Sequence, residues 1–183
     1  ITELDGATVL VTGAGLVGLT AIAIANDRGA TVIAADPDEG RRRLAERFGA
    51  RRVVDPTAAE DAPESLRSAL AELGAAEGAQ VTIEASGSAA AVTQAINALD
   101  IGGVAVLVGS VHPVGAVPLD PESMVRGLRT VRGLHNYTPR HLVEAVGYLS
   151  ERYDAYPFRE LVGAEFPLAE LDEAVALAAA GGS

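Results

Sequence analysis

The sequence predicts an α/β fold, a doubly wound parallel sheet of six strands in a single domain, and three observations support it. First, short runs of Val, Ile, Ala and Thr alternate with segments of helical spacing, in the order β-α-β-α-β and then α-β-α-β. Second, the strand candidates are almost continuously apolar, as in sheets that helices cover on both faces. Third, the 183 residues are 49% hydrophobic but only 4% aromatic, which suits an aliphatic core. Together these features predict a Rossmann fold.

In the first half of the chain, each strand candidate is followed by a helix candidate and a turn residue. The predicted strands cover residues 8–12, 31–35 and 52–54, and the predicted helices cover 17–28, 39–48 and 59–73. Gly29 and Gly49 follow the first two helices, where glycine readily takes the left-handed cap conformation. Pro63 suits the first turn of the third helix, because the N–H that proline lacks is not used there.

The second half continues the alternation and then becomes irregular. The predicted strands cover 79–83, 104–108 and 130–134, and the predicted helices cover 89–99, 121–126, 139–152 and 169–180. A turn is expected at Gly102 and Gly103, and the continuous apolar run that follows predicts a buried central strand. Asp120 and Pro121 suit the N-cap and first position of the short helix. Residues 111–118 are expected to form a loop, and residues 161–166 an extended segment.

The first strand leads into a glycine turn, Gly13-Ala14-Gly15-Leu16-Val17-Gly18, and the next strand ends at Asp36. Strand, glycine turn, helix, strand and acid together form the dinucleotide-binding fingerprint. Gly13 permits the tight turn, Gly15 lets the backbone approach a pyrophosphate, and Gly18 allows close helix packing. The helix N-terminus offers free N–H groups to phosphates. Asp36 is predicted to accept both ribose hydroxyls of an adenosine. The structural alternative is an ordinary turn beside a solvated aspartate.

Charge and composition exclude several classes of function. The net charge is −11, and the short basic run 41–43 is predicted to be a solvated helix face, so nucleic acid is not an expected partner. All 14 basic residues are arginine, which excludes a Schiff-base lysine and a phosphate-loop lysine. Without cysteine the chain has no disulfide, thiolate nucleophile or cysteine-ligated zinc. No apolar run is long enough to predict a membrane span, and a cytoplasmic protein is expected.

Five stretches of the sequence resemble the nucleotide-binding domain of the medium-chain, zinc-type alcohol dehydrogenases. They are 9–18, Asp36, 81–87, 103–109 and 131–134, and their order is more specific than the glycine motif alone. In that family a catalytic domain with zinc ligands precedes this domain and is re-entered after it. The resemblance implies an NAD-binding domain over 1–156 and, over 157–183, a segment leading back towards a catalytic domain missing from this chain. The start at Ile1 without Met fits this interpretation.

The resemblance also implies a set of cofactor contacts. Val17 would pack against the nicotinamide, Arg41 would reach the adenosine ribose beside Asp36, and the segments after the fourth, fifth and sixth strands would line the rest of the cleft. The implied cofactor-binding residues are Gly13, Gly15, Leu16, Val17, Gly18, Asp36, Arg41, Ala85, Ser86, Val108, Gly109, Ser110, Leu134 and Asn136. For each non-glycine residue of this set, core packing or a loop position is the alternative.

The three histidines match no zinc-binding spacing, and no metal site is predicted in this chain. Surface or capping roles are expected for His112, His135 and His141. His135 and Asn136 follow the sixth strand, beside the expected nicotinamide end, so either of them could contact cofactor or substrate. This segment resembles a branch of the family that acts on polyols or aminocyclitols.

These features predict the NAD(H)-binding domain of a zinc-dependent alcohol or polyol dehydrogenase, which transfers a hydride between an alcohol and NAD. Zinc is expected only in the missing catalytic domain, so the chain alone should bind cofactor without turnover. A homodimer through the edge strand 130–134 is also expected. Two alternatives stay open: a regulatory NAD(H)-sensing module, and a zinc-free quinone reductase, against which Asp36 argues because such enzymes commonly use NADP. Short-chain dehydrogenases fit less well, since their glycine spacing needs glycine at Val17.

Overall fold

The computed structural model describes residues 3–57 and 62–179, and the chain forms two compact units, 1–136 and 137–183. The described part of the first unit contains a six-stranded sheet in the order β3-β2-β1-β4-β5-β6, and all neighbouring strands pair in parallel. The strands are β1 (Thr8–Thr12), β2 (Thr31–Ala35), β3 (Arg52–Val54), β4 (Ala79–Glu84), β5 (Leu99–Leu107) and β6 (Thr130–Gly133). The chain proceeds outward from β1 to β3 and then in the opposite direction from β4 to β6. The predicted doubly wound, six-stranded parallel sheet is therefore confirmed.

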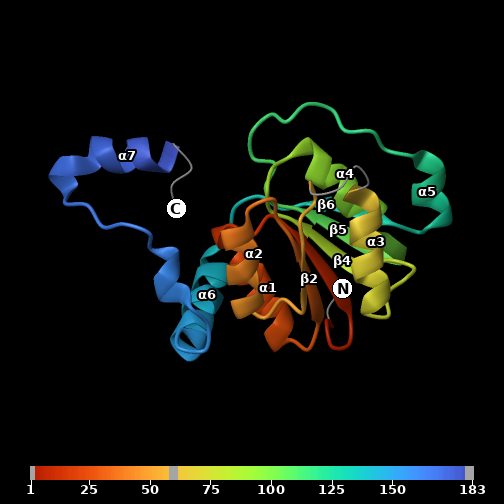
Figure 1. Cartoon of the computed structure of the whole chain (residues 1–183), viewed down its shortest axis with the longest axis horizontal. Helices are drawn as coiled ribbons and strands as arrows, with labels where there is room; N and C mark the ends of the chain where they lie inside the picture. Colours follow the sequence, from red (N-terminus) through yellow and green to blue (C-terminus); the bar gives the residue numbers. More distant parts are fainter. Residues whose placement is uncertain (1–2, 58–61, 180–183) are drawn as a thin grey trace. The chain divides into compact units, whose positions relative to one another are not determined.

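Helices connect the strands and cover both faces of the sheet. They are α1 (Leu16–Asp27), α2 (Glu39–Arg47), α3 (Ala62–Glu72), α4 (Ala89–Asn97) and α5 (Pro121–Arg126). Figure 1 shows α1 and α2 on one side of the sheet and α3 and α4 on the other. Such two-sided cover explains why the residues of β1 are all buried and why the strand reads as a continuous apolar run.

The core between the sheet and the helices is aliphatic, as the composition predicts. On one side of the sheet, Leu10 and Ile33 from the strands pack with Leu66 and Leu70 of α3. A second cluster joins α4 to β5, with Met124 and Val131 packed against it, and consists of Val92, Ile96, Leu99 and Ala105. Burial of these side chains removes apolar surface from water, which is the main stabilising term for such a sheet. The strand ends are thereby held in fixed positions.

The fifth strand differs from its prediction. It begins at Leu99 rather than at residue 104, so the turn expected at Gly102 and Gly103 is absent and both glycines lie inside β5. Gly102 has a φ of +74° and donates its N–H to the carbonyl oxygen of Gly127, and the pairing with β4 shifts register between Ala79 and Val81. An irregularity of the β-bulge type therefore accommodates the glycines without ending the strand. The preceding helix, α4, ends at Asn97, two residues earlier than predicted.

The second unit contains α6 (Pro139–Arg152), the short 3-10 helices η1 (Phe158–Leu161) and η2 (Leu168–Glu170), and α7 (Leu171–Ala179). Tyr153, Tyr156 and Phe158 form a small aromatic cluster within it. Of the segment 161–166, which was expected to be extended, Leu161 instead ends η1, and residues 162–166 form no helix or strand. The expected helix 169–180 begins as η2 before α7, with residue 180 outside the described residues. The same applies to residues 59–61 of the helix expected over 59–73. The expected boundary between an NAD-binding domain over 1–156 and a segment over 157–183 that leads back towards a catalytic domain stays a prediction.

No helix within residues 3–57 and 62–179 is long and apolar enough to cross a membrane.

Candidate functional site

The glycine turn lies at the carboxyl end of β1, between the two halves of the sheet. Gly13 has a φ of +90° and donates its N–H to the carbonyl oxygen of Ala35 at 2.8 Å, which fixes the turn against β2. Gly15 is the N-cap of α1 and supplies no side-chain hydrogen bond to the helix. The first N–H groups of α1 consequently remain available for an anion, and the helix dipole adds a partial positive charge there.

The three motif glycines have different surroundings. A Cβ atom at Gly18 would collide with the carbonyl oxygen of Gly13, so glycine here allows α1 to pack on the turn. A Cβ at Gly13 would lie 2.7 Å from the backbone nitrogen of Ser86, so the turn also approaches the loop after β4. A Cβ at Gly15 would meet no atom within 4 Å. Gly15 therefore faces open space beside the N-terminus of α1, where a ligand can approach the backbone.

The carboxylate of Asp36 joins the end of β2 to the glycine turn. Its Oδ2 accepts a hydrogen bond from the Ala14 N–H at 2.8 Å, and its Oδ1 accepts one from the Asp38 N–H at 2.9 Å. Asp36 is only 3% exposed. Each carboxylate oxygen has two lone pairs, so both oxygens can accept one further donor such as a ribose hydroxyl. The aspartate predicted to bind a ligand is thus also an anchor of the turn.

The three arginines of the run 41–43, near the start of α2, have different partners. Arg42 donates to the carbonyl oxygens of Asp36 and Pro37, both at 2.7 Å, and lies 3.0 Å from the Asp55 carboxylate. Hydrogen bonds from the hydroxyl and backbone N–H of Thr57, together with the Arg42 charge, hold the pKa of Asp55 below its usual value. Arg42 therefore fixes the turn that follows β2.

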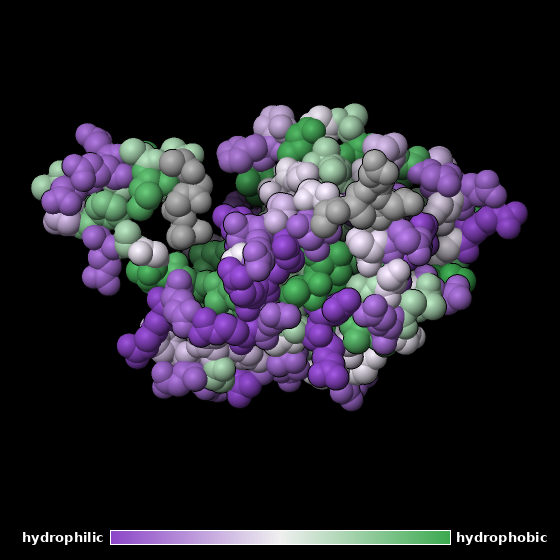
Figure 2. All heavy atoms as spheres, in the orientation of Figure 1, coloured by the Kyte–Doolittle hydropathy of each residue, from purple (hydrophilic) through white to green (hydrophobic). Residues whose placement is uncertain are grey.

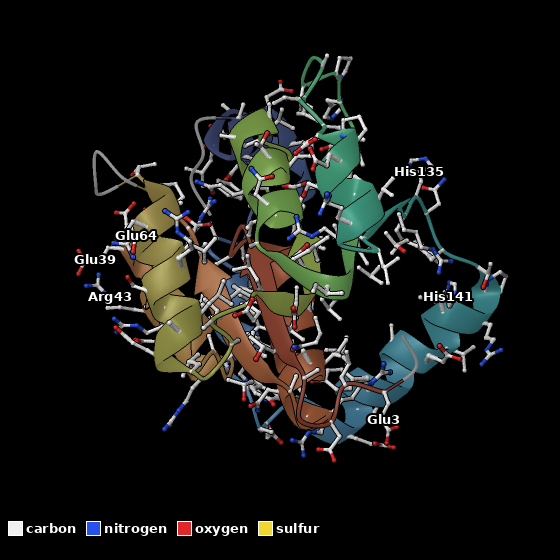
Figure 3. The ribbon with its side chains drawn as sticks, turned by 90° about the vertical axis from the view of Figure 1, so that its right-hand side faces the viewer. Glu3, Glu39, Arg43, Glu64, His135 and His141 are labelled. Atoms are coloured by element: carbon white, nitrogen blue, oxygen red, sulfur yellow. The ribbon has the colours of Figure 1, made fainter. Side chains whose placement is uncertain are left out.

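The other two arginines are exposed, and Figure 2 shows a hydrophilic surface where α2 lies. Arg43 forms an exposed ion pair with Glu39 at 2.6 Å, and Figure 3 shows these two side chains next to each other. Arg41 is exposed, and its guanidinium has no hydrogen-bond or ion-pair partner among the described residues. Arg41 and Arg43 are solvated as predicted, but the prediction is wrong for Arg42, whose guanidinium is held by the carbonyl oxygens of Asp36 and Pro37 and by Asp55. Arg41 is the cation of the run that a ligand beside Asp36 can recruit.

A buried carboxylate that the sequence analysis did not assign to the site holds the next two loops. Glu84, at the end of β4, is fully buried, and its Oε1 accepts hydrogen bonds from the Ser86 N–H, the Ser86 hydroxyl and the Gly87 N–H at 2.7–2.8 Å. The Ser110 hydroxyl lies 3.4 Å from its Oε2. The sequence does contain a signal for this role: an acidic residue ends an apolar strand and is followed by Ala, Ser and Gly. A buried carboxylate needs hydrogen-bond donors, and the N–H and hydroxyl groups of such a loop supply them.

The loops after β4 and β5 also touch through their backbones. Val108 and Gly109 donate their N–H groups to the carbonyl oxygen of Glu84 at 2.8 and 2.9 Å. A Cβ at Gly109 would collide with the Gly87 nitrogen, and a Cβ at Gly87 would lie 2.6 Å from the Gly109 carbonyl oxygen. The structure therefore brings together the glycine turn and both loops, which hold most of the predicted site residues.

The remaining predicted residues lie around this group. Leu16 and Val17, at the start of α1, are 66% and 50% exposed, which is unusual for aliphatic side chains in so apolar a helix. Leu134 directly follows β6 and donates its N–H to the carbonyl oxygen of Leu107 at 3.0 Å. Asn136 is exposed and has a φ of +58°. These side chains are accessible to a ligand.

A depression of about 180 Å³ adjoins the glycine turn on the α4 side of the sheet. It is smaller than the clefts of about 300–1,000 Å³ that take a whole drug-sized ligand, so it suits one part of a larger molecule. Its lining is mainly apolar and comes from the ends of β1 to β3, the loop after β4 and α4. The lining residues are Thr12, Gly13, Ala35, Pro37, Pro56, Thr57, Ser86, Ser88, Ala90, Ala91 and Gln94.

No group of three or more His, Cys, Asp or Glu side chains that could hold a metal occurs within residues 3–57 and 62–179. His141 has the capping role that was expected as one of two options: its Nδ1 accepts the Thr138 N–H at 3.2 Å at the start of α6. His135 is exposed on the segment after β6 (Figure 3).

Comparison with known proteins agrees with this geometry. A family model described as zinc-binding dehydrogenase matches residues 17–151. The L-threonine 3-dehydrogenase of Anaeromyxobacter dehalogenans is 40% identical over 129 residues, which are 69% of this chain and 35% of that protein. An alcohol dehydrogenase from Thermotoga maritima superimposes with a TM-score of 0.78 at 29% identity, over 83% of this chain and 42% of that one. A putative zinc-binding dehydrogenase from Sinorhizobium meliloti, solved with NADP, gives a TM-score of 0.63 at 31% identity, over 70% and 37%. The chain spans less than half of each relative.

Proposed function

Because the chain belongs to the zinc-binding dehydrogenase family, we propose that it is the NAD(H)-binding part of a dehydrogenase that moves a hydride between an alcohol and NAD. The observation that carries the proposal is the joined unit of Asp36 and the glycine turn, set beside the open N-terminus of α1. This unit lies where the strand order reverses, which is where open α/β sheets bind dinucleotides.

The residues present fit a dinucleotide laid across the carboxyl edge of the sheet. The open space at Gly15 and the free N–H groups of α1 suit the pyrophosphate. Asp36 has lone pairs for the adenosine ribose, and the depression between Pro37, Pro56 and α4 suits the adenine. The nicotinamide half would then extend over the loops after β4 and β5, near the exposed Val17. When bound, NAD supplies the hydride acceptor, and the chain binds and orients it.

We propose that the substrate and the zinc bind to a catalytic domain that lies outside these 183 residues. The relatives that the chain matches are about twice as long, and they include an alcohol dehydrogenase and a threonine dehydrogenase. An alcohol or polyol substrate is therefore proposed, with a zinc-bearing catalytic domain that polarises its oxygen. The 183 residues alone should bind NADH and show no alcohol-dependent NADH formation, with or without added zinc.

Cofactor titration tests the proposal and its preference for NAD. We expect NAD(H) to bind more tightly than NADP(H) by about tenfold or more, since a 2′-phosphate would lose the ribose bonds to Asp36 and face its carboxylate. The positive charge of Arg41 would attract the 2′-phosphate of NADP(H), so Arg41→Ala should increase the preference for NAD(H) over NADP(H). Isothermal calorimetry on both variants with both cofactors measures this. Equal affinity, or tighter NADP, would refute the preference for NAD, and no binding of either cofactor would refute the proposed function.

We also propose a homodimer through β6. This strand pairs only with β5 among the described strands, so its outer edge has unpaired backbone groups. The Leu134 N–H faces β5, and strand alternation therefore directs the Gly133 N–H outward.

Gly133→Pro should abolish the dimer in sedimentation velocity at micromolar concentration, because it removes that outward donor without breaking a bond to β5. Gly133→Ala is the matched control, since a Cβ there meets open space. A wild-type monomer, or a dimer unaffected by proline, would contradict the interface.

A further inference from the structure

Two buried threonine hydroxyls have no hydrogen-bond partner among the described residues. They are Thr12 Oγ1, at the end of β1, and Thr82 Oγ1, in the middle of β4. Thr12 is 2% exposed and Thr82 is fully buried. A buried hydroxyl without a partner costs the free energy of its lost hydration, so each such hydroxyl needs an explanation, and a partner from outside the chain is one.

The two threonines differ in where they lie. Thr82 is inside the sheet, in register with Leu10 on one side and Ala105 on the other, and it lines no part of the depression beside the glycine turn. Thr12 is a wall residue of that depression, next to Gly13 and Ala35. A molecule that fills the depression therefore contacts Thr12 but not Thr82.

We propose that the Thr12 hydroxyl is a recognition contact for the adenine base of the bound cofactor, which rests on the proposed function. The apolar lining of the depression includes Pro37 and Pro56, which follow β2 and β3, and Ala90 and Ala91 of α4, which follows β4 on the other side of β1 in the sheet. Such a lining suits the faces of a flat heterocycle, whose edge then needs a polar partner. A threonine hydroxyl both donates and accepts, so it matches either a ring nitrogen or an amino group.

The position of Thr12 assigns the contact to the base rather than to the phosphates. The pyrophosphate space is at Gly15 and the N-terminus of α1, three residues further along the chain. Thr12 lies instead beside Ala35, its register partner in β2. Ala35 directly precedes Asp36, the residue that we propose binds the ribose. Rotation about the Cα–Cβ bond moves the hydroxyl between staggered positions, so the side chain can turn to a base that enters.

The test compares Thr12→Val with the matched control Thr82→Val. Valine has nearly the shape of threonine, so each change removes a hydroxyl without opening a cavity. Because neither hydroxyl has a protein partner, both variants should melt above wild type, by about 2–4 °C in differential scanning calorimetry. Only Thr12→Val should weaken ligand binding, by about three- to tenfold. The factor should be the same for NADH and for AMP, which holds the adenosine half alone.

The binding and melting results distinguish a failure of the Thr12 contact from a failure of the proposed function. Unchanged NADH and AMP affinity in Thr12→Val would overturn the contact, as would an equal loss in Thr82→Val. A lower melting temperature for Thr12→Val would also overturn it, because the hydroxyl would then have a partner inside the free protein. Wild-type protein that binds neither NADH nor AMP would instead refute the proposed function. A loss for NADH without a loss for AMP would place the hydroxyl at another part of the cofactor and overturn the assignment to the base.

Discussion

Replacing Gly15 with valine is expected to abolish dinucleotide binding while the protein melts as the wild type does. The backbone of Gly15 has a φ of −79° and a ψ of −170°, which any residue can adopt, and a Cβ there meets no atom of the chain. The valine side chain would instead occupy the space over the first N–H groups of α1. Losing charged hydrogen bonds to a pyrophosphate should cost roughly 3 kcal/mol or more, which is about a hundredfold in affinity.

Gly18→Ala is the informative comparison for Gly15→Val. An alanine Cβ at Gly18 would collide with the Gly13 carbonyl oxygen, so this variant should lose thermal stability as well as binding. Fluorescence titration with NADH and differential scanning calorimetry separate the two effects. Normal NADH affinity in Gly15→Val would show that the phosphates bind elsewhere, and a large fall in its melting temperature would show that the side chain meets the protein.

Glu84→Gln is expected to lower the free energy of unfolding by about 2–4 kcal/mol and to weaken cofactor binding. One oxygen of this carboxylate accepts three donors at 2.7–2.8 Å in a fully buried position. An amide oxygen is neutral and a weaker acceptor, and the amide NH₂ adds buried donors that themselves need partners. The loops that carry Ser86 and Ser110 should loosen, since Glu84 contacts both.

Glu39→Gln is the control for Glu84→Gln, because Glu39 makes an exposed ion pair with Arg43 and its loss should cost at most about 0.5 kcal/mol. Urea denaturation of the two variants gives the free energies, and NADH titration well below the melting temperature gives the binding. If Glu84→Gln unfolds and binds as the wild type does, the buried carboxylate is not what holds these loops.

The sequence by itself determined the order and type of the elements and the place of the glycine turn. These follow from local patterns: apolar strands such as 8–12, the cap residues Asp120 and Pro121, and glycines at helix ends. The boundaries were less accurate where local and tertiary effects disagree. Gly102 reads as a turn, but pairing with β4 and the bond to Gly127 keep the segment in β5.

Only the tertiary structure decided which polar groups meet at the carboxyl edge. The Asp36 carboxylate reaches the Ala14 N–H across 22 residues, and Glu84 reaches Ser110 across 26. Neither pairing leaves a local pattern, because each depends on parallel strands that bring their carboxyl ends together. The unpartnered hydroxyl of Thr12 is likewise invisible in sequence, where threonine in a strand is ordinary. The sequence therefore pointed to the candidate site through its glycines, and the packing of strand ends determined which side chains lie there.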